Sequence, residues 1–285
     1  MTDDNPRSPF RCPVALVTGA AGGMGLACAR RLANTHALIL TDVNDTRLAA
    51  ICDTLRDEDN AEIVAAICGD IANDGTIREI ATAFAASNGG CKILVHTAGL
   101  SPALADWGPI LRTNIVGTAK LLDAVEPLLT EGFVGVLLSS TARCFVPQVD
   151  GMLSAVLAQP LAHDLLERLA PLLGNDLETR TANAYAYSKA WVCQTVQQRA
   201  TRWAEHGARI ASLSPGFIRT GMTRKEVVER PEMQKLLAST PMGRWGTVSD
   251  IANAVEFIVS DKASYITGTD IVIDGGLSAR ILTQG

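Results

Sequence analysis

Short apolar stretches alternate with longer amphipathic stretches along almost the whole chain, and this alternation limits the possible folds. The apolar stretches are typical of strands and comprise Val14–Gly19, Ala37–Asp42, Glu62–Ile67, Lys92–Thr97, Gly135–Ser140, Arg209–Ser214 and Asp270–Asp274. Helical patterns occupy residues 23–34, 44–57, 73–87, 110–130, 184–205 and 248–260. This order predicts an α/β fold with βαβ units around a doubly wound parallel sheet of about seven strands, covered by helices on both faces.

Length and composition are consistent with one large α/β domain. The chain has 285 residues, of which 47% are hydrophobic and only 19% are charged, as expected for a well-buried core. We therefore expect a single domain over residues 1–285, with residues 1–11 as a flexible arm. The net charge of −5, without a basic cluster, argues against a nucleic-acid partner.

Targeting signals and metal motifs are also missing from the sequence. No apolar run is long enough to span a membrane, and the polar start Met1–Pro6 does not resemble a signal peptide. We expect a cytoplasmic protein that does not contact membranes. The seven cysteines are scattered without a Cys-x-x-Cys pair, which favours reduced thiols. The four histidines show no metal-ligand spacing, so no metal is expected.

A glycine-rich turn joins the first predicted strand to the first predicted helix. Its sequence is Thr18-Gly19-x-x-x-Gly23-Met24-Gly25. Glycines at such a junction allow the backbone to approach a pyrophosphate, which then meets the positive end of the helix dipole. The turn resembles the cofactor loop of the short-chain dehydrogenase/reductase family. This resemblance implies a Rossmann-type fold and places Gly19, Gly23, Met24 and Gly25 against a dinucleotide.

Asp42 ends the second predicted strand and bears on the identity of the cofactor. A carboxylate at this position accepts hydrogen bonds from the adenosine ribose and repels a 2′-phosphate. No Lys or Arg occupies residues 20–22 or Val43, so the sequence favours NAD. The alternative is an exposed aspartate that caps the following helix. Asp70 and Ile71, after the third strand, resemble the segment of the family that contacts the adenine.

Tyr185 and Lys189 are four residues apart in a predicted helix and therefore share one face of it. A free tyrosine has a pKa of about 10, and a neighbouring cation favours the phenolate. Tyr185 is thus a candidate acid/base for an alcohol or ketone. Tyr187 should point elsewhere. Tyr-x-x-x-Lys alone also fits an ordinary amphipathic helix with a core tyrosine and a surface lysine.

Further motifs of the family lie between the glycine turn and Tyr185. His96-Thr97-Ala98-Gly99 follows the fourth strand, where the family usually has Asn-Asn-Ala-Gly. Ala98 and Gly99 fit as small residues beside the adenosine, whereas His96 is expected to be a hydrogen-bonded core residue. Asn114 resembles the asparagine that perturbs its helix and extends a proton relay from the lysine. Its alternative is a solvent-facing polar side chain.

The fifth strand and the sixth strand supply the remaining motifs. By resemblance, Ser140 hydrogen-bonds the substrate oxygen; Ser139 is the alternative, because a shift of one residue on a strand reverses the side chain. After strand six, the resemblance places four cofactor-binding residues, which are Pro215, Gly216, Ile218 and Thr220. Residues 221–240 form a candidate substrate lid.

An insertion separates Ser140 from Tyr185. Residues 146–181 contain one short and one longer leucine-rich helical pattern, and most relatives have no such segment. The insertion is similar to that of the 3-alpha-hydroxysteroid dehydrogenase/carbonyl reductase branch. In most relatives the helices that carry Asn114 and Lys189 form a contact of a tetramer. An insertion above them predicts a homodimer through the C-terminal strand region instead, with a homotetramer as the alternative.

Together these motifs imply an NAD-dependent oxidoreductase that interconverts a secondary alcohol and a ketone by hydride transfer. A hydroxysteroid or another lipophilic carbonyl compound is the substrate suggested by the branch. The implied catalytic set is Ser140, Tyr185, Lys189 and Asn114. The alternative is a non-catalytic dinucleotide sensor or interaction protein on the same fold.

Overall fold

Seven strands form one parallel sheet in the part of the chain that the structure describes. The structure is a computed structural model and describes residues 13–87, 90–145, 151–221, 223, 227–228 and 230–284. The strand order is β3-β2-β1-β4-β5-β6-β7. The strands are β1 Val14–Thr18, β2 Ala37–Asp42, β3 Ile63–Cys68, β4 Cys91–His96, β5 Val134–Leu138, β6 Arg209–Pro215 and β7 Thr269–Ile273. The predicted α/β, doubly wound architecture is confirmed, and the predicted flexible arm, residues 1–11, lies outside the described residues.

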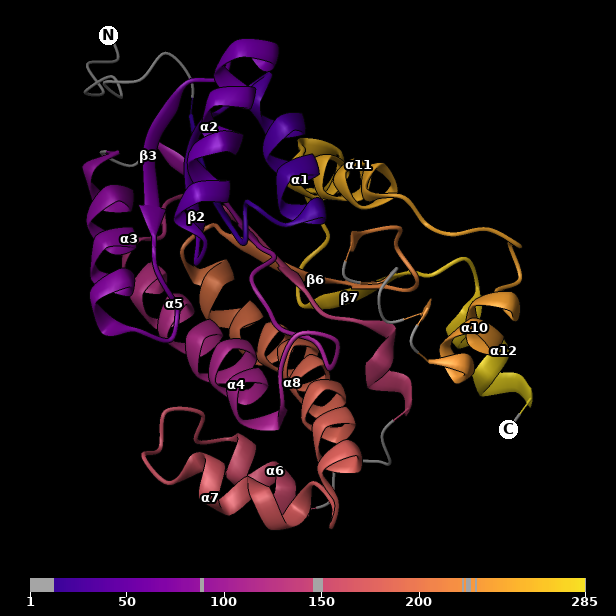
Figure 1. The fold of residues 1–285 in the computed structure, drawn as a ribbon. Coiled ribbons are helices and arrows are strands. Elements are labelled where there is room, and N and C mark those ends of the chain that lie inside the picture. Colours follow the sequence, from indigo (N-terminus) through magenta and orange to yellow (C-terminus); the bar gives the residue numbers. More distant parts are fainter. Residues whose placement is uncertain are drawn as a thin grey trace, which may run out of the picture.

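Helices cover both faces of this sheet (Figure 1). One face carries α1 Gly23–Ala33, α2 Asp45–Asp59 and α11 Val248–Val259. The other face carries α3 Asp74–Ala86, α5 Thr118–Val125 and α8 Leu177–Glu205. The smaller helices α10 Pro231–Ala238 and α12 Leu277–Gln284 lie together beyond the end of the sheet (Figure 1).

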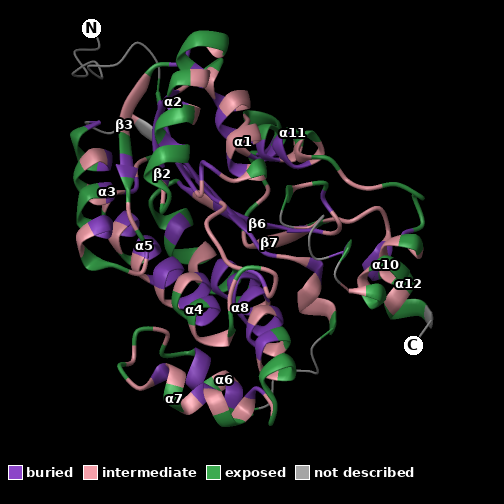
Figure 2. Cartoon of the chain, in the orientation of Figure 1, coloured by how far each residue is buried: buried purple, intermediate pink, exposed green. Residues whose placement is uncertain are grey.

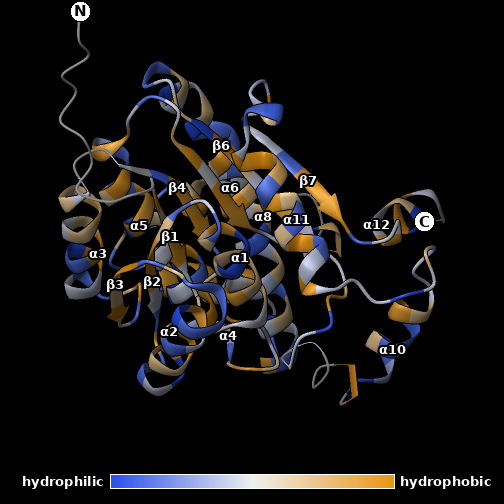
Figure 3. Ribbon diagram, turned by 90° about the horizontal axis from the view of Figure 1, so that it is seen from above, coloured by the Kyte–Doolittle hydropathy of each residue, from blue (hydrophilic) through white to orange (hydrophobic). Residues whose placement is uncertain are grey.

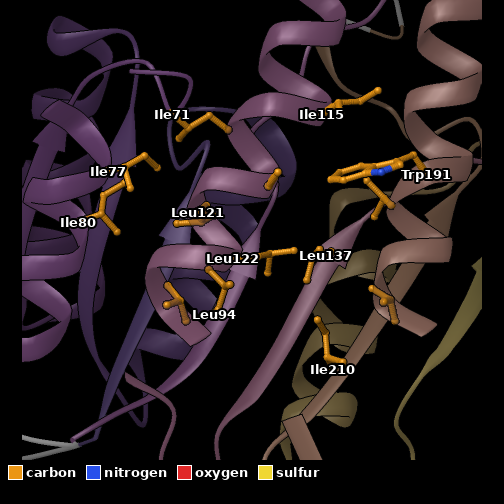
Figure 4. Close-up of a cluster of buried hydrophobic side chains, with 14 of the residues drawn as sticks. Ile71, Ile77, Ile80, Leu94, Ile115, Leu121, Leu122, Leu137, Trp191 and Ile210 are labelled. Carbon is orange, nitrogen blue, oxygen red and sulfur yellow. The ribbon is translucent and has the colours of Figure 1, made fainter. Parts of the chain in front are cut away.

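Strand β1 is a continuous apolar run because its side chains are buried on both faces of the sheet. Val14 and Leu16 contribute to one core cluster, while Ala15 and Val17 contribute to the cluster on the opposite face. All four side chains are completely buried, as expected when helices cover both faces of a parallel sheet. The buried strands form the centre of the molecule, and exposed, hydrophilic residues gather on the outer helices (Figures 2 and 3). Figure 4 shows the cluster between the sheet and helices α3, α5 and α8.

Polar caps fix the beginnings of several helices. Asn44 accepts a hydrogen bond from Arg47 N at 2.9 Å at the start of α2, and Asp176 accepts one from Thr179 N at 2.8 Å at the start of α8. The Asp176 cap explains why α8 begins at Leu177 and not at residue 184, as the sequence had suggested. The helix therefore carries two extra turns in front of Tyr185.

The helical stretch expected over residues 110–130 is present at residues 107–128, and it is perturbed around Asn114 as the family resemblance implied. The segment consists of α4 Trp107–Leu111, the π-helix η1 Arg112–Gly117, α5 and a 3₁₀ turn, η2 Glu126–Leu128. A π-turn inserts an extra residue into a helix and is frequent at functional sites. Here it contains Asn114, whose side chain bonds to a neighbouring loop instead of facing solvent.

The insertion contains two short helices, α6 Gly151–Leu157 and α7 Leu165–Leu169, so the prediction of a longer second helix is wrong. Pro171 lies in the 3₁₀ turn that follows α7, where its ring cannot continue a regular helix. Residues 146–150 lie outside the described part of the chain. The inserted helices pack below α4 and α8 (Figure 1). Their buried leucines join the main core, and Trp191 Nε1 donates to Leu157 O at 3.1 Å.

Strands β1 and β4 are neighbours in the sheet although two βα units separate them in sequence. The order of the strands reverses at this point, which opens a crevice beyond the carboxyl ends of the strands. The glycine turn after β1 and the segment after β4 border this crevice. In such folds it is the usual place for a ligand.

Candidate active site

The glycine turn between β1 and α1 is packed too tightly for side chains at two positions. Gly19 has a φ of +67°, and a Cβ there would lie 2.7 Å from Ala98 N. A Cβ on Gly25 would overlap Gly19 O. Helix α1 starts at Gly23, and its N-cap Gly22 makes no side-chain capping bond. The first turn therefore presents its backbone amides and dipole to an anion, as a dinucleotide pyrophosphate requires.

Asp42 lies beside this turn, at the end of β2. Its Oδ2 accepts from Ala21 N at 2.9 Å and its Oδ1 accepts from Asn44 N at 3.0 Å. Since Asn44 caps α2, the alternative that Asp42 is the helix cap is not what the structure shows. Arg47, which sequence reasoning missed, donates from Nη2 to Ala21 O at 2.6 Å. A carboxylate and a guanidinium thus flank the same turn.

The predicted cofactor residues that follow β6 lie near α1, Gly246 and β7. Thr220 contacts α1, because a Cβ on Gly23 would lie 3.3 Å from Thr220 Cγ2. Ile218 is buried and pairs with Gly246 in an isolated bridge. Gly216 follows Pro215 and approaches β7 closely, since its amide donates to Ile273 O at 3.0 Å. The predicted lid lies partly outside the described residues, at positions 222, 224–226 and 229.

Asp70 and Ile71 follow β3, as predicted. Asp70 is exposed and its Oδ1 accepts from Ala72 N at 2.8 Å, which forms a local turn. Ile71 is buried against Gly117, where a Cβ would lie 2.7 Å from Ile71 Cγ1. The pair therefore connects the end of β3 to the π-helix.

His96 is a core residue with both ring nitrogens bonded. Its Nδ1 lies 2.7 Å from Thr18 Oγ1 and its Nε2 lies 2.8 Å from Thr118 Oγ1. Burial, with a smaller contribution from the Lys189 cation, lowers the pKa of His96 to about 3. A neutral imidazole fits these contacts, since one nitrogen donates and the other accepts. Thr97 donates to Thr18 O at 2.7 Å, so the His-Thr pair fastens β4 to β1.

Asn114 clamps the loop that follows Gly99. Its Oδ1 accepts from Leu100 N at 2.8 Å and its Nδ2 donates to Leu100 O at 3.0 Å. The same Nδ2 donates to Ser188 Oγ at 3.0 Å. Because Asn114 is only 2% exposed, the alternative of a solvent-facing side chain is wrong. The contact with Ser188 joins the π-helix to the helix that carries Tyr185.

Tyr185 and Lys189 lie on one face of α8. The Lys189 ammonium is 5.9 Å from the centroid of the Tyr185 ring and donates to Leu138 O at 2.9 Å. Burial lowers the pKa of Lys189 to about 8, so the ammonium is still mostly protonated at neutral pH. Tyr187 is buried in the main core cluster.

Ser139 and Ser140 follow β5, which ends at Leu138, two residues earlier than predicted. Ser139 is buried and donates to Lys189 O at 2.8 Å. Ser140 is only partly buried, and its Oγ accepts from Ala142 N at 3.1 Å. The Ser139 hydroxyl is thus committed to the backbone of α8. Because Ser140 Oγ is the acceptor in its bond to Ala142 N, its own hydrogen is left for donation to another acceptor.

Gly99 is the place where these groups converge. A Cβ there would lie 3.2 Å from Asn114 Oδ1 and 3.3 Å from Lys189 Nζ. Lys189 connects in turn to the ring of Tyr185 and to Leu138, two residues before Ser140. A phenol next to a buried cation, near a serine hydroxyl, can exchange a proton with an alcohol or ketone. The tight glycine turn at the start of α1 offers the backbone amides that a dinucleotide pyrophosphate needs.

A cavity of about 420 Å³ is lined in part by Phe217, Ile218 and Met242. Neither Tyr185 nor Lys189 lines it, so it is not where the acid/base group would meet a substrate.

Among the residues that the structure describes, no three His, Cys, Asp or Glu side chains are grouped as a metal site would need. None of the described helices combines the length and apolarity of a membrane span.

Comparison with known proteins agrees with the fold. Residues 13–147 match the family described as short chain dehydrogenase, and residues 172–278 match the one described as Enoyl-(Acyl carrier protein) reductase. Galactitol 2-dehydrogenase (L-tagatose-forming) of Cereibacter sphaeroides is 32% identical over 92% of this chain and 93% of its own. The chain belongs to the short-chain dehydrogenase/reductase family. As a member of this family it is an oxidoreductase that binds a nicotinamide dinucleotide and acts on alcohols or ketones.

Two further short-chain dehydrogenases/reductases represent the branch named from the sequence. The 3-alpha-hydroxysteroid dehydrogenase/carbonyl reductase of Comamonas testosteroni is 29% identical over 93% of this chain and 96% of its own. The structure of the 3-alpha-hydroxysteroid dehydrogenase from Pseudomonas sp. B-0831, complexed with NADH, superimposes with a TM-score of 0.77. It covers 95% of this chain and 99% of its own at 24% identity, which supports the fold. The non-catalytic alternative finds no support in these matches.

Proposed function

We propose that the protein is an NAD-dependent oxidoreductase that interconverts a secondary alcohol and a ketone. The observation that carries this proposal is the buried Lys189 ammonium, 5.9 Å from the ring centroid of the partly exposed Tyr185. A cation in this position favours the phenolate of Tyr185 and lets it act as a base near neutral pH. The nearby glycine turn accounts for the dinucleotide.

Each residue of the site has a distinct part in the proposed oxidation. Tyr185 removes the hydroxyl proton of the alcohol, and a bound dinucleotide would supply the hydride-accepting chemistry. Lys189 stabilises the phenolate and holds the nicotinamide ribose. Ser140 donates a hydrogen bond to the substrate oxygen, and Asn114 fixes the loop at Leu100 and anchors a relay water. The reverse reaction uses the same groups.

The proposed substrate is a hydroxysteroid or another lipophilic carbonyl compound. Leu104 follows β4 and Phe145 follows β5, and their side chains are 51% and 47% exposed. Both segments leave the carboxyl edge of the sheet, the edge from which Ser140 also comes. Exposed apolar side chains at a site favour an apolar ligand. The name of the Comamonas testosteroni relative supports the same class.

NAD should be used in preference to NADP. We expect kcat/KM for NAD to exceed that for NADP by about tenfold or more, because Asp42 would bond the ribose hydroxyls and repel a 2′-phosphate. The test is the rate with each cofactor, measured over a panel of secondary alcohols and ketones at the nicotinamide absorbance. Equal or better use of NADP by the unmodified protein would contradict the assignment.

Two variants test separately the two charged residues that flank the glycine turn, Asp42 and Arg47. Asp42→Asn should narrow the preference for NAD by improving the rate with NADP. Arg47→Met should leave the rate with NAD nearly unchanged and reduce whatever use of NADP remains, since the guanidinium contacts Ala21 O on the same turn. A preference that stays the same in Asp42→Asn would show that another residue selects the cofactor.

We also propose a homodimer. Helices α6 and α7 cover part of α4 and α8, which would obstruct a subunit contact through the helices of Asn114 and Lys189 (Figure 1). Strand β7 is an edge of the sheet, and its Val272 is 39% exposed. Phe257 of α11 is 45% exposed. Sedimentation of the full-length protein should give the mass of two chains. A stable tetramer that uses the α4 and α8 face would rule the proposal out.

A further inference from the structure

A cluster of buried polar groups lies where the middle of β6 pairs with the beginning of β7, at Ser212, Ser214 and Asp270. Asp270 on β7 accepts hydrogen bonds from Ser212 Oγ at 2.6 Å and from Ser214 Oγ at 2.8 Å. Arg143 completes the cluster, with Nη2 2.7 Å from Asp270 Oδ2 and Nε 3.1 Å from Ser214 Oγ. The side chain of Asp270 is 9% exposed and that of Arg143 is 28% exposed, so water screens this ion pair poorly.

Arg143 belongs to the short 3₁₀ turn η3, Thr141–Phe145, which directly follows Ser140. The turn is tied to Ser140 twice, through Ala142 N to Ser140 Oγ at 3.1 Å and through Arg143 N to Ser140 O at 3.2 Å. Thr141 Oγ1 donates to Pro215 O at 3.3 Å. This turn therefore sets the position of the Ser140 hydroxyl. The ion pair of Arg143 with Asp270 holds the turn against β7.

We propose that Arg143 is a positioning residue, which holds η3 so that the Ser140 hydroxyl meets the substrate oxygen. This inference depends on the proposed function of Ser140. The guanidinium suits the task because its planar fork bonds Ser214 and Asp270 at once, which fixes its direction as well as its distance. Arg143 itself does not touch the reacting atoms in this proposal; it acts through Ser140.

The position of the ion pair explains why a fixed turn is needed here. The insertion begins shortly after Phe145, so the chain leaves the sheet close to the site. Among the described residues, the side-chain hydrogen bonds from this turn to β6 come from Thr141, to Pro215 O, and from Arg143, to Ser214 Oγ, so the loss of Arg143 leaves the first of them. A displacement of about 1 Å at a catalytic group can cost about 10²-fold in rate.

A double-mutant cycle tests whether Arg143 acts through Ser140. Arg143→Met should lower kcat about 10- to 100-fold and leave the Kd for the cofactor within about twofold, because the glycine turn is not involved. In a Ser140→Ala background, Arg143→Met should lower kcat by less than about threefold, since no hydroxyl remains to be positioned. Arg143→Lys keeps the charge and loses the planar fork, so its kcat should lie between that of Arg143→Met and that of the unmodified protein. The same variant replaces Arg143→Met in the cycle if Arg143→Met folds poorly.

Arg209→Met is the matched control. Arg209 lies at the opposite end of β6, is also partly buried, and bonds Ile266 O at 3.1 Å and Ile258 O at 3.0 Å. It should lower thermal stability and leave kcat almost unchanged. An equal loss of kcat from Arg143→Met in both backgrounds would overturn the inference while leaving the proposed function intact. Full activity of Ser140→Ala would instead overturn the assignment of Ser140 and the inference with it.

Discussion

Replacing Tyr185 by Phe should abolish turnover, with kcat falling about 10³-fold or more. The change removes only the hydroxyl that exchanges a proton with the substrate. The ring keeps its place near Lys189, whose ammonium is 5.9 Å from the ring centroid. The Kd for the dinucleotide should therefore stay within about twofold of the unmodified value. Turnover is followed at the nicotinamide absorbance, and the Kd is measured by titration of the cofactor.

Tyr187→Phe is the matched control, because it removes the same hydroxyl group two residues further along α8. Tyr187 is 8% exposed and belongs to the main core cluster, so its loss should affect stability more than kcat. If Tyr187→Phe were inactive and Tyr185→Phe active, the acid/base would have been assigned to the wrong tyrosine. If both variants kept full activity, neither tyrosine would be the acid/base.

Lys189→Met should also abolish activity, with a loss of about 10²-fold or more in kcat. The variant lacks the cation beside Tyr185 and the group proposed to hold the nicotinamide ribose. Lys120→Met is a suitable control, since Lys120 is bonded to Asp74 and Ala72 O on the surface side of α5. Lys120→Met should retain kcat. Substantial activity of Lys189→Met would exclude the lysine from the mechanism.

The same variant should reveal the cost of burying Lys189. Burial lowers the pKa of Lys189 from 10.5 to about 8 in the folded protein. Between these two pH values Lys189 is protonated in the unfolded chain and mostly neutral in the folded protein. The free energy of unfolding therefore increases as the pH rises, which means that the folded protein becomes more stable. Relative to Lys189→Met, the unmodified protein should gain up to about 3 kcal/mol between pH 8 and pH 10.5. Below pH 8 this gain is absent.

Denaturant unfolding of both proteins at several pH values measures that difference. Groups that titrate identically in the two proteins cancel, so the change in the difference reports Lys189. A difference that does not vary with pH would show that the lysine is not desolvated as the structure indicates. That result would also argue against a strong stabilisation of the Tyr185 phenolate by the Lys189 cation.

The sequence was sufficient for the fold because its signals are local. Each strand is a short apolar run, and the alternation of core faces in β1 follows from the two-residue period of a strand. The glycine turn was equally readable, since the backbone at Gly19 has a positive φ that other residues rarely adopt. These features depend on neighbours in the chain, and sequence patterns report such neighbours well.

Contacts between distant segments could not be read in the same way. The π-helix around Asn114 accompanies side-chain bonds to Leu100 and Ser188, which no periodic pattern contains. The orientations of Ser139 and Ser140 depend on bonds to Lys189 O and Ala142 N, which no sequence pattern contains. The arginines near the site were missed for the same reason: Arg47 reaches the glycine turn across 26 residues, and Arg143 reaches Asp270 across 127.

Transfer of deuterium from substrate to cofactor tests the central claim most directly. Secondary alcohols carrying deuterium on the carbinol carbon are incubated with NAD and the unmodified protein, and the nicotinamide is analysed by NMR. We predict that at least one lipophilic alcohol of the panel places deuterium at nicotinamide C4, and that Tyr185→Phe places none above background. Binding of NAD without deuterium transfer from any alcohol, and without reduction of any ketone by NADH, would contradict the account.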